Sequence, residues 1–170
     1  MNNFKKVALA SLVFAAIGTA QAAQDPTATV VWSGVIPGNT AGDTLLITGL
    51  GGDLTEQSGT LTPAADGTFT SETIVLEARV NDGVDAANPV VGALQSANWS
   101  IASSTLTYGG VSNTTAALEV SIDGVVVTDT AAAATGAETI GLSVAQNAPL
   151  TDVGGQTVQA AVTVLATSAL

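Results

Sequence analysis

The chain has 170 residues, with 3 Lys and Arg against 14 Asp and Glu, no His and no Cys. Without histidine it lacks the usual general base near neutral pH and the commonest metal ligand, and without cysteine an exported domain depends on burial and hydrogen bonds for its stability. Because Lys and Arg are so few, a surface for nucleic acid or anionic lipid, which needs clustered cations, is excluded.

The first 22 residues have the pattern of a secretion signal. Two lysines precede an apolar stretch, residues 7–18, that is too short to span a bilayer, and Ala20 and Ala22 are the small residues before a signal-peptidase site. We therefore expect cleavage after Ala22 and export of residues 23–170. The exported form keeps Arg79 as its only cationic side chain, and we interpret its acidity as a source of solubility.

The exported part opens with an alternating strand, residues 27–36. Its small and apolar side chains recur at every second position, which places them on one face of a strand. These residues are Ala28, Val30, Trp32, Gly34 and Ile36. A strand near a chain terminus is easily lent to a neighbouring molecule.

Short strands separated by turn signals fill the middle of the chain. We expect strands at 44–48, 59–62, 68–80, 99–108, 118–122, 125–127 and 140–144. Asp66–Gly67 and Asp123–Gly124 are signals for hairpin turns. Trp99, Ile101 and Ser103 alternate, and their strand is expected to run on through Leu106 and Tyr108. Ala131 to Ala134 is a low-complexity patch, either a loop or a single helical turn.

A second alternating strand lies near the end of the chain, at residues 156–167, where Thr and Val favour an extended backbone. Its apolar residues share one face. They are Val158, Ala160, Val162, Val164 and Ala166. With roughly eight to ten short strands in all, the pattern is typical of an antiparallel sandwich or barrel.

No catalytic set is visible in the sequence. Serine and threonine are plentiful, but neither a histidine nor a lysine is present in the exported chain to act as their base. Two carboxylates are able to run a glycosidase mechanism, but most of the acids lie in turns, where Asp is favoured for backbone reasons. Glu77 and Glu119 are expected on outward faces of their strands. We therefore expect no enzyme, no cofactor and no metal site.

Two binding sites are possible on composition but less favoured. Residues 81–85 with Asn88 look like part of a calcium loop, yet they lack its ordered acidic series and its final bidentate Glu, so an ordinary turn is the preferred interpretation. Trp32, Trp99 and Tyr108 are candidates for a carbohydrate-binding platform. With so few aromatic residues, alternating positions favour burial in a core instead.

The layout of the chain resembles a chaperone–usher pilus subunit. The resemblance rests on the opening strand at 29–36, on residues 43–50 and on the closing run 155–166, and it is nearest to the cysteine-free common-pilus (Mat-type) and alpha-class fimbrillins. Two features differ from the type 1 and P-type subunits. The disulfide of those subunits is absent, and their penultimate aromatic residue is replaced, since the chain ends in Ala169 and Leu170.

The resemblance implies an all-β, immunoglobulin-like antiparallel sandwich that is incomplete because its last strand is missing. Residues 1–22 would be the signal peptide, 23–36 an N-terminal donor strand and 37–170 the pilin domain. A periplasmic chaperone would fill the groove first, and the donor strand of the next subunit would replace it after delivery to an outer-membrane usher. The partners implied are copies of the same chain, chaperone, usher and a tip adhesin, in a fimbrium at the cell surface.

The site residues implied by this resemblance fall into two sets. The donor face would be Ala28, Val30, Trp32, Gly34 and Ile36, and the edge of the groove that meets the chaperone would be Val158, Ala160, Val162, Val164 and Ala166. Two other functions remain open from the sequence. One is a self-contained exported β-sandwich that acts as a carbohydrate-binding or adhesin module, and the weaker one is a secreted hydrolase.

Overall fold

A computed structural model of the chain describes residues 42–169, and the fold that they form is all-β. Valine, threonine and isoleucine are common along the strands, and Gly and Asp occupy the turns, as these residue types prefer. The expected signal peptide and the strand at 27–36 lie outside the described residues. Within 42–169 there is no helix of the length and hydrophobicity that a membrane span requires.

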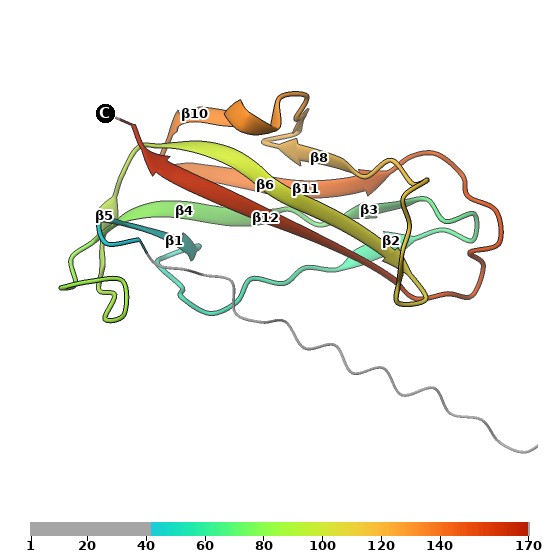
Figure 1. Cartoon of the computed structure of the whole chain (residues 1–170), viewed down its shortest axis with the longest axis horizontal. Helices are drawn as coiled ribbons and strands as arrows, with labels where there is room; N and C mark the ends of the chain where they lie inside the picture. The colour runs from blue at the N-terminus through green and yellow to red at the C-terminus, as the bar shows by residue number, and fades with distance from the viewer. Residues whose placement is uncertain (1–41, 170) are drawn as a thin grey trace, which may run out of the picture. The chain divides into compact units, whose positions relative to one another are not determined.

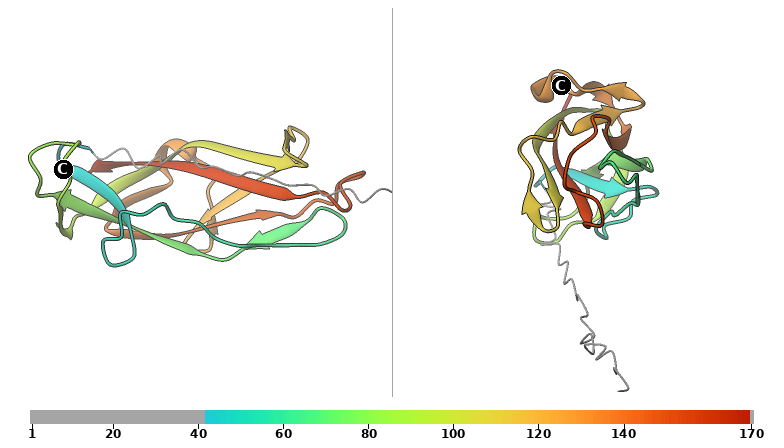
Figure 2. Two further views of the ribbon diagram at one scale, coloured as in Figure 1. Left: turned by 90° about the horizontal axis from the view of Figure 1, so that it is seen from below. Right: turned by 90° about the vertical axis from the view of Figure 1, so that its right-hand side faces the viewer.

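The strands form two antiparallel sheets that lie face to face as layers (Figures 1 and 2). The larger sheet comprises β1 (Leu45–Gly49), β2 (Leu61–Pro63), β3 (Phe69–Ser71), β4 (Ile74–Asn81), β5 (Val91–Leu94), β8 (Glu119–Ile122), β9 (Val125–Val126) and β11 (Thr139–Gln146). The smaller sheet comprises β6 (Ala97–Tyr108), β7 (Val111–Ser112), β10 (Ala134–Ala137) and β12 (Val158–Ser168). The predicted antiparallel sandwich is therefore confirmed.

In the larger sheet, β11 is central. It pairs with β8 on one side and with β4 and β3 on the other. β1 pairs with β4, and β2 pairs with β3, so β1 and β2 form the outer edge of this sheet in two pieces. In the smaller sheet, β6 lies between β10 and β12.

The core consists of two hydrophobic clusters between the sheets. The first contains Trp99, which is 1% exposed, with Ala78 and Ile140 among its buried members. The second contains Phe69, Leu106, Tyr108 and Val153. The half-buried side chain of Val144 packs against both clusters, so β11 links them.

Both predicted hairpin turns are present. Asp123 and Gly124 have φ angles of 52° and 79°, the left-handed conformation that a two-residue turn between β8 and β9 requires. Gly67 has a φ of 83° in the turn between β2 and β3. The alanine patch contains a short 3₁₀ turn, η1 (Thr130–Ala132), whose N-cap is Asp129.

The expected strand at 68–80 is wrong as a single element, because it breaks after Ser71 into β3 and β4. At the break, the backbone N–H of Glu72 donates to the carbonyl of Thr60, which draws the chain toward β2. The Ser71 hydroxyl accepts a hydrogen bond of 2.9 Å from the N–H of Val144 on β11. A side chain thus replaces a backbone partner where the strand is interrupted.

The long strand β6 contains a β-bulge that the expected alternation missed. Ser103 pairs with Thr163 and Ile101 pairs with Val164, which leaves Ala102 as the extra residue. Ser103 was expected to follow Trp99 and Ile101 on one face, but it is exposed. The extra residue shifts the alternation by one, so Leu106 and Tyr108 return to the buried face.

Candidate functional site: an open edge along β12

β12 forms a strand because its residues alternate and many of them are β-branched. It pairs antiparallel with β6 over its full length of 11 residues, from Val158 opposite Tyr108 to Ser168 opposite Ala97. The predicted strand at 156–167 is thus confirmed from Val158 onward.

β12 is an edge strand. Among residues 42–169, its ladder partner is β6 alone, and no described strand pairs with its other side. The strands nearest to it across the gap are β1 and β2, the outer edge of the opposite sheet. In this part of the chain, the two sheets therefore present free edges to each other, and we call the region between β12 and the strands β1 and β2 the seam. In Figure 1, β12 runs in front of the larger sheet.

The inward face of β12 is only half-buried. Its five inward residues are Val158, Ala160, Val162, Val164 and Ala166, and each is of intermediate exposure. On the paired strand β6, by contrast, Trp99, Leu106 and Tyr108 are buried. The apolar face of β12 therefore lacks part of the cover that its neighbour has.

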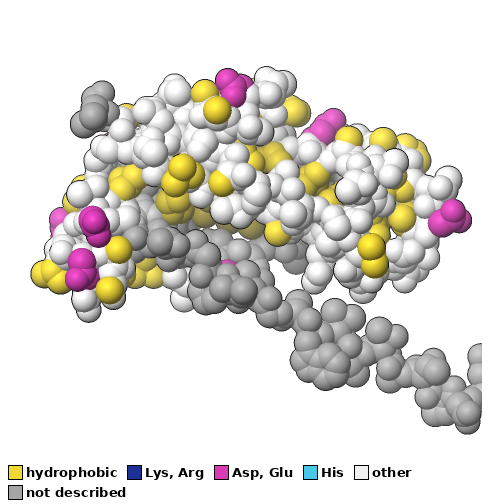
Figure 3. All heavy atoms as spheres, viewed as in Figure 1, with side chains coloured by type: hydrophobic (Ala, Val, Ile, Leu, Met, Phe, Trp, Pro, Cys, Tyr) yellow, Lys and Arg dark blue, Asp and Glu magenta, His cyan; other side chains and the backbone are white. Residues whose placement is uncertain are grey.

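This seam runs past both core clusters. Val162, Val164 and Ala166 pack against the first cluster, whereas Val158 and Ala160 pack against the second. From the opposite sheet, the half-buried Leu45 and Ile47 pack on the first cluster and Leu61 packs on the second. Figure 3 shows hydrophobic side chains in a broken row across the face on which β12 lies.

The seam ends in a hollow near the start of β12, lined by residues 63–65, 153–156, Tyr108 and Val158 and with a volume of about 240 Å³. The Tyr108 hydroxyl donates to the carbonyl of Gly67. Burial raises the pKa of Tyr108, and the charge of Asp66 adds to this effect. No pattern in the sequence indicated this hollow, because it forms between loops that are far apart along the chain.

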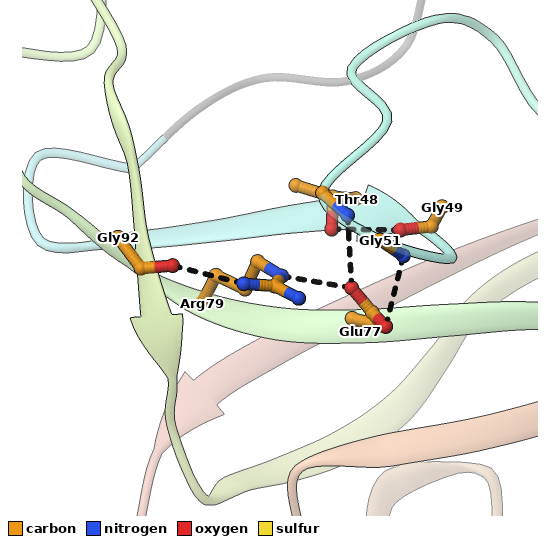
Figure 4. Close-up of polar contacts among 7 residues, drawn as sticks. Thr48, Gly49, Gly51, Glu77, Arg79 and Gly92 are labelled. Carbon is orange, nitrogen blue, oxygen red and sulfur yellow. Dashed lines mark hydrogen bonds and ion pairs between the residues drawn. The ribbon is translucent and has the colours of Figure 1, made fainter.

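An ion pair between the buried Glu77 and the half-buried Arg79 holds the turn after β1 (Figure 4). Arg79 Nε donates to Glu77 Oε2 at 2.8 Å, and Arg79 Nη1 donates to the carbonyl of Gly92 at 3.0 Å. The N–H groups of Gly51 and Gly52 donate to the two Glu77 oxygens at 3.1 and 3.0 Å. The pKa of Glu77 lies below its usual value, first because Arg79 donates to it and then because of the two backbone N–H groups, although burial opposes this.

The expectation of an outward, solvated Glu77 is therefore wrong, since its side chain is buried and the residue is 4% exposed. Alternation places it correctly on the face opposite Leu76, but the turn at Gly51–Gly52 folds over that face. Glu119 is half-buried on β8 and accepts a hydrogen bond of 2.6 Å from the Asn147 amide. The two carboxylates thus have separate structural partners and are not a facing pair.

The proposed calcium-loop residues close a turn. The Asn81 amide oxygen accepts from the N–H groups of Gly83 and Val90, at 2.9 and 3.0 Å, and its nitrogen donates to the carbonyls of Gly42 and Asp85, at 3.0 and 3.2 Å. Asp85 Oδ1 accepts from the backbone of residues 87–88. These oxygens are engaged with the backbone, which agrees with the preferred interpretation of an ordinary turn.

The aromatic residues proposed as a carbohydrate platform do not form one within the described chain. Trp99 is buried in the first cluster and its Nε1 donates to the Ala137 carbonyl at 2.9 Å. Tyr108 is buried in the second cluster. Their assignment to the core is confirmed, whereas Trp32 lies outside the described residues.

Of the two predicted sets of site residues, only the β12 set lies within the described chain. The β12 set lies along the open seam. The donor set, Ala28, Val30, Trp32, Gly34 and Ile36, falls outside residues 42–169. A comparison of the chain with protein-family models and with curated proteins found no match.

Proposed function

We propose that this chain is a structural, non-enzymatic subunit of a surface pilus that polymerises when one copy lends the strand at 27–36 to the open edge of the next copy. The observation that carries the proposal is the condition of β12. It is a long, strictly alternating strand whose inward face is half-buried and which pairs on one side only within residues 42–169. Such an edge is a template for a further strand.

The physical gain from a lent strand has two parts. Backbone groups on the free side of β12 would obtain ladder partners, and the apolar face of the strand would cover the seam between the sheets. Each large apolar side chain that becomes fully buried contributes about 1.5–3 kcal/mol. Val30, Trp32 and Ile36 are the residues suited to this burial, and Gly34 suits a shallow point along the seam.

The position of the first described residue, Gly42, favours head-to-tail assembly into a filament. Gly42 accepts a hydrogen bond from the Asn81 side chain at the end of β4. The end of β12 lies at the same end of the domain, because Gln95 bonds both Ala78 on β4 and Ser168 on β12. We name this the entry end, and we name the opposite end, with Tyr108 and the start of β12, the far end.

This placement relates strand direction to assembly. Suppose that the strand at 27–36 of one copy, the donor, runs antiparallel to β12 of another copy, the acceptor. Residue 36 of the donor then lies at the far end of the acceptor, and the entry end of the donor follows at the same place. Each copy then donates its strand from the entry end and receives the strand of another copy beginning at the far end. Such a head-to-tail contact produces an open filament and not a closed ring. A strand returning to its own seam from Gly42 would instead run parallel to β12 and would produce a monomer.

The remaining partners come from the resemblance to chaperone–usher subunits. A periplasmic chaperone would protect the seam before assembly, an outer-membrane usher would order the exchange, and a tip adhesin would end the fibre. In this proposal the subunit is carried to the cell surface, where the fimbrium supports adhesion. The alternative of a self-contained carbohydrate-binding module loses two of its three aromatic candidates, since Trp99 and Tyr108 are buried.

The proposal is tested by placing a charge on the donor face. We expect Trp32→Asp, expressed together with its cognate periplasmic chaperone, to leave a soluble subunit but to abolish filaments, because an unpaired charge is costly to bury. Thr29→Asp, on the opposite face, is the matched control and should still assemble. Sheared material run unheated in detergent should show a ladder for wild type and Thr29→Asp, and monomer for Trp32→Asp.

The same experiment can overturn the proposal. If Trp32→Asp removes the soluble subunit even when the chaperone is present, Trp32 belongs to the subunit's own core. The chain would then be a self-complete β-domain, and the binding-module alternative would replace the pilus subunit.

A further inference from the structure

We infer that the contact between successive copies has a second part, in which the loop 82–90 of one copy seats in a hollow at the far end of the next. This inference rests on the proposed function, because the lent strand is what brings the two ends together. It adds an interaction surface between the folded bodies, separate from the seam along β12. The partner is a second copy of this chain.

The loop 82–90 is fastened to the residue at which the described chain begins. Asn81 donates to the Gly42 carbonyl, and the N–H of Ala86 donates to Asp43 Oδ1 at 3.3 Å. The position of the lent strand at 27–36 therefore restricts where this loop can lie. The only intervening segment is residues 37–41, and the path from residue 36 to Gly42 spans at most about 22 Å when fully extended.

The loop is also ordered before any contact forms. Asn81 and Asp85 accept hydrogen bonds from backbone N–H groups within it, and the N–H of Asp82 donates to the Val90 carbonyl at 2.9 Å. Because its backbone is already held, docking would cost little conformational entropy. At its tip, Val84 is 88% exposed, which makes it one of the most exposed large apolar side chains of the described chain.

The receiving surface is a larger hollow at the far end, of about 520 Å³, between the loops 109–115 and 151–156. Tyr108 and Val153 form its apolar floor, and they also line the smaller hollow where the seam of β12 ends. Val111, 70% exposed, also lines it, together with hydroxyl and amide side chains and the carboxyl group of Asp152. The hollow thus combines apolar cover for Val84 with polar groups for the backbone of a loop.

The two surfaces meet if the strand is lent in the antiparallel direction. Residue 36 would then lie near Val158, which lines the smaller hollow. The short segment 37–41 confines the entry end of the donor copy to this region. The loop 82–90 is held to Gly42 through the side chain of Asn81 and to Asp43 by the N–H of Ala86, and it is therefore a part of the donor copy that is carried to the larger hollow.

Cysteine pairs provide the test, because the chain has no cysteine of its own. We would prepare full-length Val84→Cys/Val111→Cys filaments, treat them with a short bismaleimide, boil them in detergent and separate the products. Val84→Cys/Thr114→Cys provides a second pair, since Thr114 is exposed and lines the same hollow. Val84→Cys/Val125→Cys is the control, because Val125 is equally exposed at 70% but lies on β9, away from the hollow.

We expect a covalent ladder that survives boiling for either hollow pair and at most a trace for the control. If filaments are seen by electron microscopy but both hollow pairs yield only monomer after boiling, or if the control cross-links equally well, this contact is wrong while strand lending stands. If the wild-type chain forms no filaments at all, the proposed function fails, and the contact fails with it.

Discussion

β6 and β12 are neighbours in one sheet and pair along the whole of β12, yet they differ in how their inward faces are covered. Trp99, Leu106 and Tyr108 of β6 are buried between the two sheets, whereas the inward residues of β12 are all half-buried. β6 has a strand on each side, and β12 has one on a single side within the described residues. The comparison shows that a strand's alternation fixes which face turns inward, but its neighbours decide how far that face is buried.

The largest loss of stability is expected from a substitution on the fully buried inward face of β6. Trp99→Ala should lower the free energy of unfolding of the exported chain by about 3–5 kcal/mol, because it leaves a large cavity in the first cluster. It also removes the donor to the Ala137 carbonyl. Urea unfolding followed by circular dichroism measures this difference. A loss below about 1 kcal/mol would mean that Trp99 is not a central core residue.

A smaller loss of stability is expected from Glu77, whose buried charge lies on the face of β4 that points away from the core. Glu77→Gln should lower the free energy of unfolding by roughly 1.5–3 kcal/mol, since hydrogen bonds to charged groups are worth about that much. Arg79 and the N–H groups of the turn at Gly51–Gly52 would lose their charged acceptor. Glu56→Gln, at an exposed carboxylate, is the control and should change little.

The same ion pair predicts a pH dependence. Because the pKa of Glu77 is lowered in the folded state, the unfolded chain binds more protons between the two pKa values. The contribution of the ionised Glu77 side chain to the free energy of unfolding is therefore complete above its unfolded-state pKa, about 4.3. It is lost as the pH falls through the lower pKa that Glu77 has in the folded state. Asp53 and Asp66 have pKa values lowered in the same direction, so the difference between wild type and Glu77→Gln isolates Glu77. Parallel curves for the two proteins below pH 5 would contradict this assignment.

The smallest effect is expected on β12 itself. Val162→Ala should cost the unassembled chain about 1 kcal/mol or less, because only half of the side chain leaves an apolar environment. In assembled filaments the same change should lower the temperature of dissociation, since a lent strand would complete the burial of Val162. If Val162→Ala destabilises the unassembled chain as strongly as a core substitution, the edge is already covered within one copy, and the comparison with β6 no longer holds.

The sequence predicted the parts of the fold that depend on local pattern. β12 and the hairpin at Asp123–Gly124 follow from alternation and from residues that tolerate a left-handed backbone. The break after Ser71 and the bulge at Ala102 were missed, although an odd spacing between Ile101 and Leu106 was a signal for the bulge. Single-residue shifts of this kind depend on the strand opposite, which a local pattern does not contain.

The candidate site was predictable only in part. The inward residues of β12 were identified because period-two spacing is a property of the strand alone. The burial of Glu77 was missed because it depends on a turn in which the donors, Gly51 and Gly52, lie 26 and 25 residues earlier in the chain. The smaller hollow at the far end is lined by residues from three separate regions of the sequence, so its existence follows from the topology and not from any motif.

The register between β12 and β6 also has a mechanical consequence. In the proposed filament, tension would enter each copy through Gly42 and β1 and would leave through the strand lying along β12. Both β1 and β12 run in antiparallel ladders with their neighbours, β4 and β6. Pulling along these strands would load their hydrogen bonds in shear, all at once, whereas pulling across them would open the bonds one after another. A subunit without disulfides would thus resist stretching through the length of its longest ladder.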